Sequence, residues 1–254
     1  MKSSSILLPL FCLMMWSCHD EAEIPVLPTE FEGPKVAVGN GHAWTFIITN
    51  DILEPQTIGI RFNESALQNL PTGSMHADEF QLSMPPELSV PPFNHATLDW
   101  NEMGHEPPGV YDIPHFDMHF YFISPSQRDQ IAPTDTAAFN KPLEPQHLAP
   151  DYLELPGGVP RMGSHIIDLL SPEIAGTGTF THTFIYGKYN ATINFLEPMV
   201  SKPFLDSKTT ITKPIRWPER WQETGYYPEQ YTISYDATTS TYSIALEGLT
   251  WQDR

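Results

Sequence analysis

Residues 104–121 read GHEPPGVYDIPHFDMHFY, and the segment that begins at His115 alternates between apolar and polar side chains. The apolar positions are Phe116, Met118, Phe120 and Phe122, and the polar ones are His115, Asp117, His119 and Tyr121. Because successive side chains of a β-strand point to opposite faces, this pattern predicts a strand with one face in a hydrophobic core. The other face then carries a row of ionisable groups, which is a suitable place for a functional site.

The rest of the chain extends this β pattern. Three pairs of β-like segments flank short turns and predict hairpins, namely 43–49 with 57–62, 179–186 with 191–196, and 231–235 with 241–246. The 26 prolines argue against long helices, and only 126–131 and part of 166–170 have helical character. We therefore expect an all-β fold, a single antiparallel β-sandwich or barrel-like domain over 36–254, with long Pro-rich loops and one or two short helices.

The charge of the chain excludes two classes of partner. There are 31 acidic and 13 basic residues, which give a formal net charge of −18. A protein of this charge does not neutralise nucleic-acid phosphates or bind an anionic membrane surface through its folded part. We expect no nucleic-acid partner.

The N-terminus resembles an export signal. Met1–Cys18 has a lysine at position 2, an apolar stretch too short to span a bilayer, and a small residue before Cys18. This pattern predicts a lipoprotein signal peptide over 1–17, lipidation of Cys18, and a flexible tether over 18–35. The protein would then be anchored by lipid in a bacterial cell envelope, on the periplasmic or the exposed side of the outer membrane. An ordinary cleaved signal with an incidental cysteine is the alternative.

Histidine and aspartate side chains together suit zinc, iron, manganese or copper. His115 and His119 lie about 13 Å apart along a straight strand, too far for both to reach one ion through bonds of about 2 Å. We therefore expect ligands from elsewhere to join them, and our main hypothesis uses His105, His119 and His165. The full set of predicted metal-binding residues is His105, His115, Asp117, His119 and His165, with Tyr121, His182 and Glu197 as additional candidates.

Other interpretations of the polar face remain open. The histidines and Asp117 can form a structural network inside the sandwich, in a non-enzymatic binding or self-assembling envelope protein. The same groups can also carry out acid–base chemistry without a metal. If a metal is bound and the protein is an enzyme, metal-assisted hydrolysis or an oxygen-dependent reaction is expected. The sequence contains no Gly-x-Ser-x-Gly elbow and no phosphate-binding glycine-rich loop.

An aromatic cluster near the C-terminus offers a further alternative. It consists of Trp217, Trp221, Tyr226, Tyr227, Tyr231 and Tyr235. Exposed rings on such loops stack on sugars, which would make this a carbohydrate-binding protein. Rings of this kind more often close the end of a β-sandwich as a satellite core.

Several segments together resemble a domain-of-unknown-function family of bacterial secreted proteins, typified by a Thermus protein under extracytoplasmic sigma/anti-sigma control. The similar segments are GNGHAWTF (39–46), IGIRF (58–62), LDWN (98–101), the stretch 104–121, MGSH (162–165), FIYG (184–187), FLEPM (195–199) and GYYP (225–228). One departure is Ile166, where the family often has tryptophan. The resemblance implies one β-rich secreted domain that self-assembles, with no established activity. His105, His115, Asp117, His119 and His165 fall on the family's motif positions, to which no chemical role is assigned.

Overall fold

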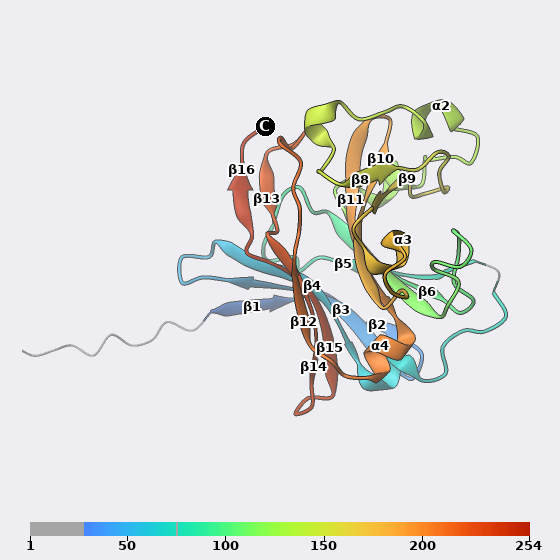
Figure 1. The fold of residues 1–254 in the computed structure, drawn as a ribbon. Coiled ribbons are helices and arrows are strands. Elements are labelled where there is room, and N and C mark those ends of the chain that lie inside the picture. The colour runs from blue at the N-terminus through green and yellow to red at the C-terminus, as the bar shows by residue number, and fades with distance from the viewer. Residues whose placement is uncertain (1–27, 75) are drawn as a thin grey trace, which may run out of the picture.

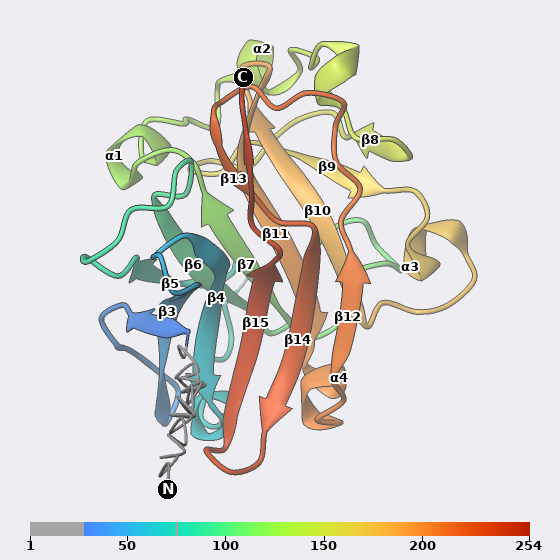
Figure 2. The same ribbon diagram turned by 90° about the vertical axis from the view of Figure 1, so that its left-hand side faces the viewer.

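Two antiparallel sheets pack face to face in the computed structural model, which describes residues 28–74 and 76–254 (Figure 1). Sheet A, onto which Figure 2 looks, has seven strands in the order β1-β3-β4-β15-β14-β12, with β2 also paired to β3. Its strands are β1 (Thr29–Glu32), β2 (Val36–Val38), β3 (Gly41–Thr49), β4 (Pro55–Asn63), β12 (Ile211–Pro214), β14 (Gln230–Asp236) and β15 (Thr241–Glu247).

Sheet B also has seven strands, in the order β5-β6-β7-β11-β10-β9-β8. They are β5 (Asp78–Ser83), β6 (His95–Asn101), β7 (His115–Tyr121), β8 (Tyr152–Glu154), β9 (Ser164–Asp168), β10 (His182–Tyr189) and β11 (Thr192–Ser201). A separate two-stranded ribbon pairs β13 (Gly225–Tyr227) with β16 (Thr250–Gln252). The expected all-β, sandwich-like fold is confirmed, as are the three predicted hairpins β3–β4, β10–β11 and β14–β15.

Helices in the described residues are short. They are α1 (Pro125–Arg128), α2 (Thr136–Phe139), α3 (Pro172–Ala175), α4 (Lys202–Asp206) and the 3-10 turns η1 (Glu64–Leu67) and η2 (Pro145–His147). None of these helices is long and apolar enough to cross a membrane. The helix expected at 126–131 corresponds to α1, which Ser124 begins by accepting a hydrogen bond from the Gln127 backbone. The helical prediction for 166–170 is wrong, because residues 164–168 form β9, paired through Ile166 with Tyr186.

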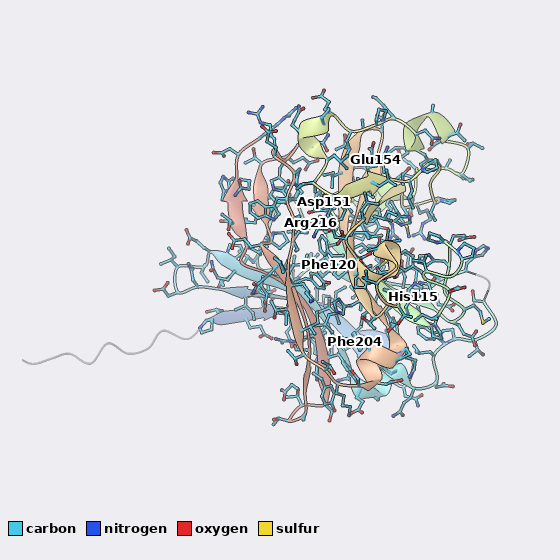
Figure 3. The ribbon with its side chains drawn as sticks, in the orientation of Figure 1. His115, Phe120, Asp151, Glu154, Phe204 and Arg216 are labelled. Carbon is cyan, nitrogen blue, oxygen red and sulfur yellow. The ribbon has the colours of Figure 1, made fainter. Side chains whose placement is uncertain are left out.

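The main core lies between the two sheets. Phe62 of sheet A stacks on Phe116 of sheet B, with ring centroids 5.9 Å apart. Phe120 belongs to the same buried cluster, and it points between the sheets in Figure 3 while His115 lies on the other side of the strand. The alternation of β7 therefore has the predicted effect, with its aromatic face in the core.

The outer face of sheet B is also covered. Figure 1 shows loops and short helices on the side of this sheet that faces away from sheet A. A second apolar cluster, built around Tyr111, Ile167 and Phe180, lies on this side. Every residue of β6 and β7 is consequently buried. Burial of polar groups is costly unless they are paired, so the polar face of β7 must have specific partners.

The N-terminal predictions fall largely outside the described residues. The expected signal peptide over 1–17 and Cys18 both lie there, as does most of the expected tether. The end of that tether is instead a strand, because Thr29–Glu32 pairs with the end of β3.

Candidate functional site

A layer of buried and partly exposed polar side chains lies between the outer face of sheet B and its covering loops. We call it the polar layer, and it comprises Asp99, Asn101, His105, His115, Asp117, His119, His165 and Glu197. Strand pairing places Asp99 beside Asp117 and Asn101 beside His115, all on one face. His115 and His119 are completely buried, whereas the side chains of His105 and His165 are 30% and 20% exposed. The polar layer thus reaches solvent through His105 and His165.

The first triad consists of His105, His115 and Asp117. Asp117 is central, with Oδ2 3.2 Å from His105 Nε2 and Oδ1 3.1 Å from His115 Nε2. Asn101 Nδ2 also donates a hydrogen bond to Oδ2 of Asp117 at 2.8 Å. His105 reaches this position because the backbone of its loop turns back at Gly104, which has a φ of +71°. A Cβ at Gly104 would lie 2.1 Å from the carbonyl oxygen of Tyr111, so only glycine fits there.

The proton positions on the two imidazoles of the first triad are fixed by backbone carbonyls. Nδ1 of His105 donates to Glu106 O and Nδ1 of His115 donates to Ile113 O, each at 2.7 Å. A carbonyl oxygen only accepts, so each Nδ1 carries a proton, and in the neutral form of either ring the Nε2 lone pair points at Asp117. His115 Nε2 and Asp117 Oδ1 have no hydrogen-bond partner in the described part of the chain. Two lone pairs facing a buried carboxylate repel it unless a cation, a proton or a metal ion, lies between them.

The second triad consists of His119, His165 and Glu197. His119 Nε2 lies 3.4 Å from Glu197 Oε1, and His165 Nε2 lies 3.7 Å from Glu197 Oε2. The other nitrogen of His119, Nδ1, lies 3.1 Å from Asp99 Oδ2, which fixes the N–H on that side of the ring. His119 Nε2 and Glu197 Oε2 lack hydrogen-bond partners among residues 28–74 and 76–254. The second triad therefore repeats the arrangement of the first.

The spacing of both triads suits a metal ion. The donor atoms within each triad all lie within 4.8 Å of one another. Tetrahedral coordination with bonds of about 2.0–2.1 Å holds neighbouring ligand atoms about 3.3–3.5 Å apart. The nitrogen–oxygen distances of 3.1, 3.2, 3.4 and 3.7 Å bracket that spacing. An imidazole that donates its second N–H to a carboxylate or a carbonyl is the usual arrangement of a metal-bound histidine.

Burial and mutual charge shift the pKa values of these groups. Burial by itself lowers the pKa of His105, but the hydrogen bond and negative charge of Asp117 raise it to about 9. Burial also lowers the pKa of His119, but the negative charges of Glu197 and Asp99 outweigh this effect and raise the pKa to about 9. Burial raises the pKa of Glu197 to about 8, and burial lowers that of His165 to about 3. Without a metal, protons on His105, His119 and Glu197 thus balance the charges near neutral pH, and a metal ion would displace them.

The structure divides the predicted ligands differently from the sequence hypothesis. His105 was grouped there with His119 and His165, but it lies with His115 and Asp117. Glu197, an additional candidate, is the central carboxylate of the second triad. Tyr121 stacks on His119 with ring centroids 5.5 Å apart and lies outside both triads. His182 lies elsewhere, with its Nδ1 3.0 Å from the hydroxyl of Tyr231.

The aromatic cluster near the C-terminus is part of the main core and not the separate satellite core that was expected. Trp221 is 4% exposed and stacks on Tyr227 with ring centroids 3.8 Å apart. Trp217 donates a hydrogen bond to Pro228 O, and Tyr231 is buried. Such packed rings leave little surface on which a sugar can stack.

Sequence reasoning missed two supporting residues, Asp99 and Asn101. The signal was present, since residues 98–101 (LDWN) alternate as β7 does, with Leu98 and Trp100 in the main core. Asp99 and Asn101 then share the outer face.

Comparison with known proteins gives one partial match. A family model described as "TTHB210-like: Hypothetical protein TTHB210" matches residues 54–100. The match runs from β4 to β6 and includes Asp99 but no member of either triad. It agrees with the family resemblance over this part of the chain, and it brings no activity with it. No curated protein and no solved structure is similar enough to count as a match.

Proposed function

We propose that this protein binds divalent transition-metal ions in the polar layer, one ion at each triad. The observation that carries the proposal is the fixed orientation of His115 and His119. In both rings the Nδ1–H donates a hydrogen bond that directs Nε2 at a buried carboxylate, and in both cases Nε2 lacks a described hydrogen-bond partner. Zinc, iron, manganese and copper all accept this nitrogen and oxygen donor set.

The burial of the two triads limits the chemistry that bound ions can perform. His115, His119 and the central carboxylates are almost inaccessible, and only the edges at His105 and His165 reach solvent. Each triad supplies two imidazoles and a carboxylate, which leaves one tetrahedral position for a further side chain, water or a small substrate. Hydrolytic or oxygen-dependent chemistry at that position would have to take place beside His105 or His165.

Elemental analysis of the full-length protein, purified without a histidine tag or chelator and dialysed against zinc, tests the proposal. We expect near-stoichiometric binding at each triad, with Asp117→Asn losing the ion of the first triad and Glu197→Gln that of the second. His42→Ala is the matched control, because His42 is exposed and lies outside both triads. Absence of bound metal from the wild-type protein after loading near neutral pH would overturn the proposal in favour of a structural histidine–carboxylate network.

We further propose that the protein is a lipid-anchored component of a bacterial cell envelope. The proposal is supported by the sequence of Met1–Cys18 and by the resemblance to a secreted family. Labelled palmitate supplied to a bacterial host should be incorporated into the wild-type protein and into Cys12→Ser but not into Cys18→Ser. Equal labelling of Cys18→Ser would contradict the assignment of the anchor.

A further inference from the structure

The thioether of Met162 lies beside the second triad. Met162 Sδ lies 3.2 Å from His165 Nε2, the same nitrogen that faces Glu197 Oε2 at 3.7 Å. Bonds of about 2.0 Å to nitrogen and about 2.3 Å to sulfur hold two such ligand atoms of one tetrahedral ion about 3.5 Å apart. The sulfur therefore lies close to this ligand–ligand distance from one donor of the second triad.

Met162 is held in this place by its backbone. Its carbonyl oxygen accepts a hydrogen bond from Nδ2 of Asn194 at 2.8 Å, and its N–H donates to Val159 O at 3.2 Å. Asn194 itself is 2% exposed. The next residue, Gly163, has a φ of +130°, and a Cβ there would lie 2.4 Å from the carbonyl oxygen of Lys188. The loop is thus packed closely against β10 and β11, which limits the positions that the sulfur can take.

We propose, building on the metal-binding function above, that Met162 is the fourth ligand of the second triad and makes it a copper site. A thioether is a soft ligand that selects Cu(I), and imidazole also suits copper. The first triad offers two imidazoles and a carboxylate, the nitrogen and oxygen donors that suit zinc, iron or manganese. The sulfur of Met162 then gives the second triad its preference for copper.

X-ray absorption spectroscopy of the copper-loaded protein tests this assignment directly. The chain has two cysteines, Cys12 and Cys18, so in a full-length Cys12→Ser/Cys18→Ser protein any sulfur bound to copper comes from methionine. We expect one sulfur scatterer at about 2.3 Å together with nitrogen or oxygen scatterers. A spectrum that requires only nitrogen and oxygen scatterers would overturn the proposal, and this result needs no substitution within the polar layer.

Competition with a Cu(I) chelator under anaerobic conditions gives the second measurement. Met162→Leu keeps the size of the side chain but removes the sulfur, so Cu(I) affinity should fall at least about tenfold while zinc affinity stays nearly unchanged. Met103→Leu is the control, because Met103 is 71% exposed. Unchanged Cu(I) affinity in a folded Met162→Leu protein, with zinc still bound at both triads, would refute the copper assignment alone. Loss of all metal binding from the wild-type protein would refute the metal-binding function as well.

Discussion

Oδ2 of Asp99 lies 3.1 Å from Nδ1 of His119, on the side of the ring opposite to Glu197. Thr97 Oγ1 lies 3.2 Å from the same nitrogen. The contact with Asp99 orients the imidazole of His119 and fixes its N–H on Nδ1, so that Nε2 remains available for a cation. Asp99 therefore acts on the second triad without being one of its ligands.

Asp99→Asn should weaken metal binding at the second triad by about 10–100-fold, because the amide orients the ring less firmly and makes Nε2 less basic. The first triad should keep its affinity. Competition with a chelator of known affinity measures both sites, and Asp151→Asn, a change at an exposed position, is the control. Equal affinity in Asp99→Asn and the wild type would show that the carboxylate does not support His119.

The stability of the metal-free protein should fall as the pH rises from about 7 to 9.5. The pKa values of His105 and His119 are about 9 in the folded protein, above the value of about 6.5 in unfolded chains. Their contribution to the free energy of unfolding is therefore fully present below about pH 6.5 and is lost as the pH passes about 9. Glu197, with a folded pKa of about 8, acts in the same direction.

Urea unfolding at several pH values measures this dependence. In Asp117→Asn the negative charge that raises the pKa of His105 is gone, so the loss of stability above pH 7 should be smaller. Metal affinity should rise over the same pH range, because the ion no longer competes with protons. A wild-type unfolding free energy that stays constant from pH 7 to 9.5 would contradict the pKa shifts.

The two faces of β7 should respond differently to mutation. Phe120→Ala removes a fully buried ring from the main core and should lower the free energy of unfolding by about 3–5 kcal/mol. His119→Gln should abolish metal binding at the second triad while leaving the aromatic core intact. Unfolding curves and elemental analysis of both variants check this separation. Loss of metal from a folded Phe120→Ala protein, at concentrations that saturate the wild type, would show that the faces are coupled.

The sequence predicted the strands of this fold better than their association. The alternation in residues 115–121 was enough to place Phe116 in the core and His119 on the opposite face. The contact between His119 and Glu197 depends on β7 pairing with β11, which is distant in the chain and reaches it only through the sheet order. His165 was a candidate ligand, yet its segment was predicted partly as helix, since a short apolar run fits either structure.

Burial on both sides of sheet B was not predictable either. A strand with alternating polar residues is ordinarily half exposed, and the sequence does not show that loops cover the polar face. In the structure the loop after Asn101 folds over β7 and brings His105 to Asp117. The first triad therefore depends on the conformation of an irregular segment, for which periodicity gives no signal.

That dependence leads to a prediction about two glycines in the same loop. Gly104 and Gly109 have φ values of +71° and +79°, so alanine at either position should cost about 1–2 kcal/mol of backbone strain. Only at Gly104 does the new Cβ meet the backbone, at 2.1 Å from Tyr111 O, whereas no described atom lies within 4 Å of a Cβ at Gly109. Gly104→Ala should therefore displace His105 and reduce metal occupancy of the first triad, and Gly109→Ala should not. Elemental analysis should show that the second triad remains filled in both variants. Equal metal occupancy of the first triad in Gly104→Ala and Gly109→Ala would exclude His105 as a ligand.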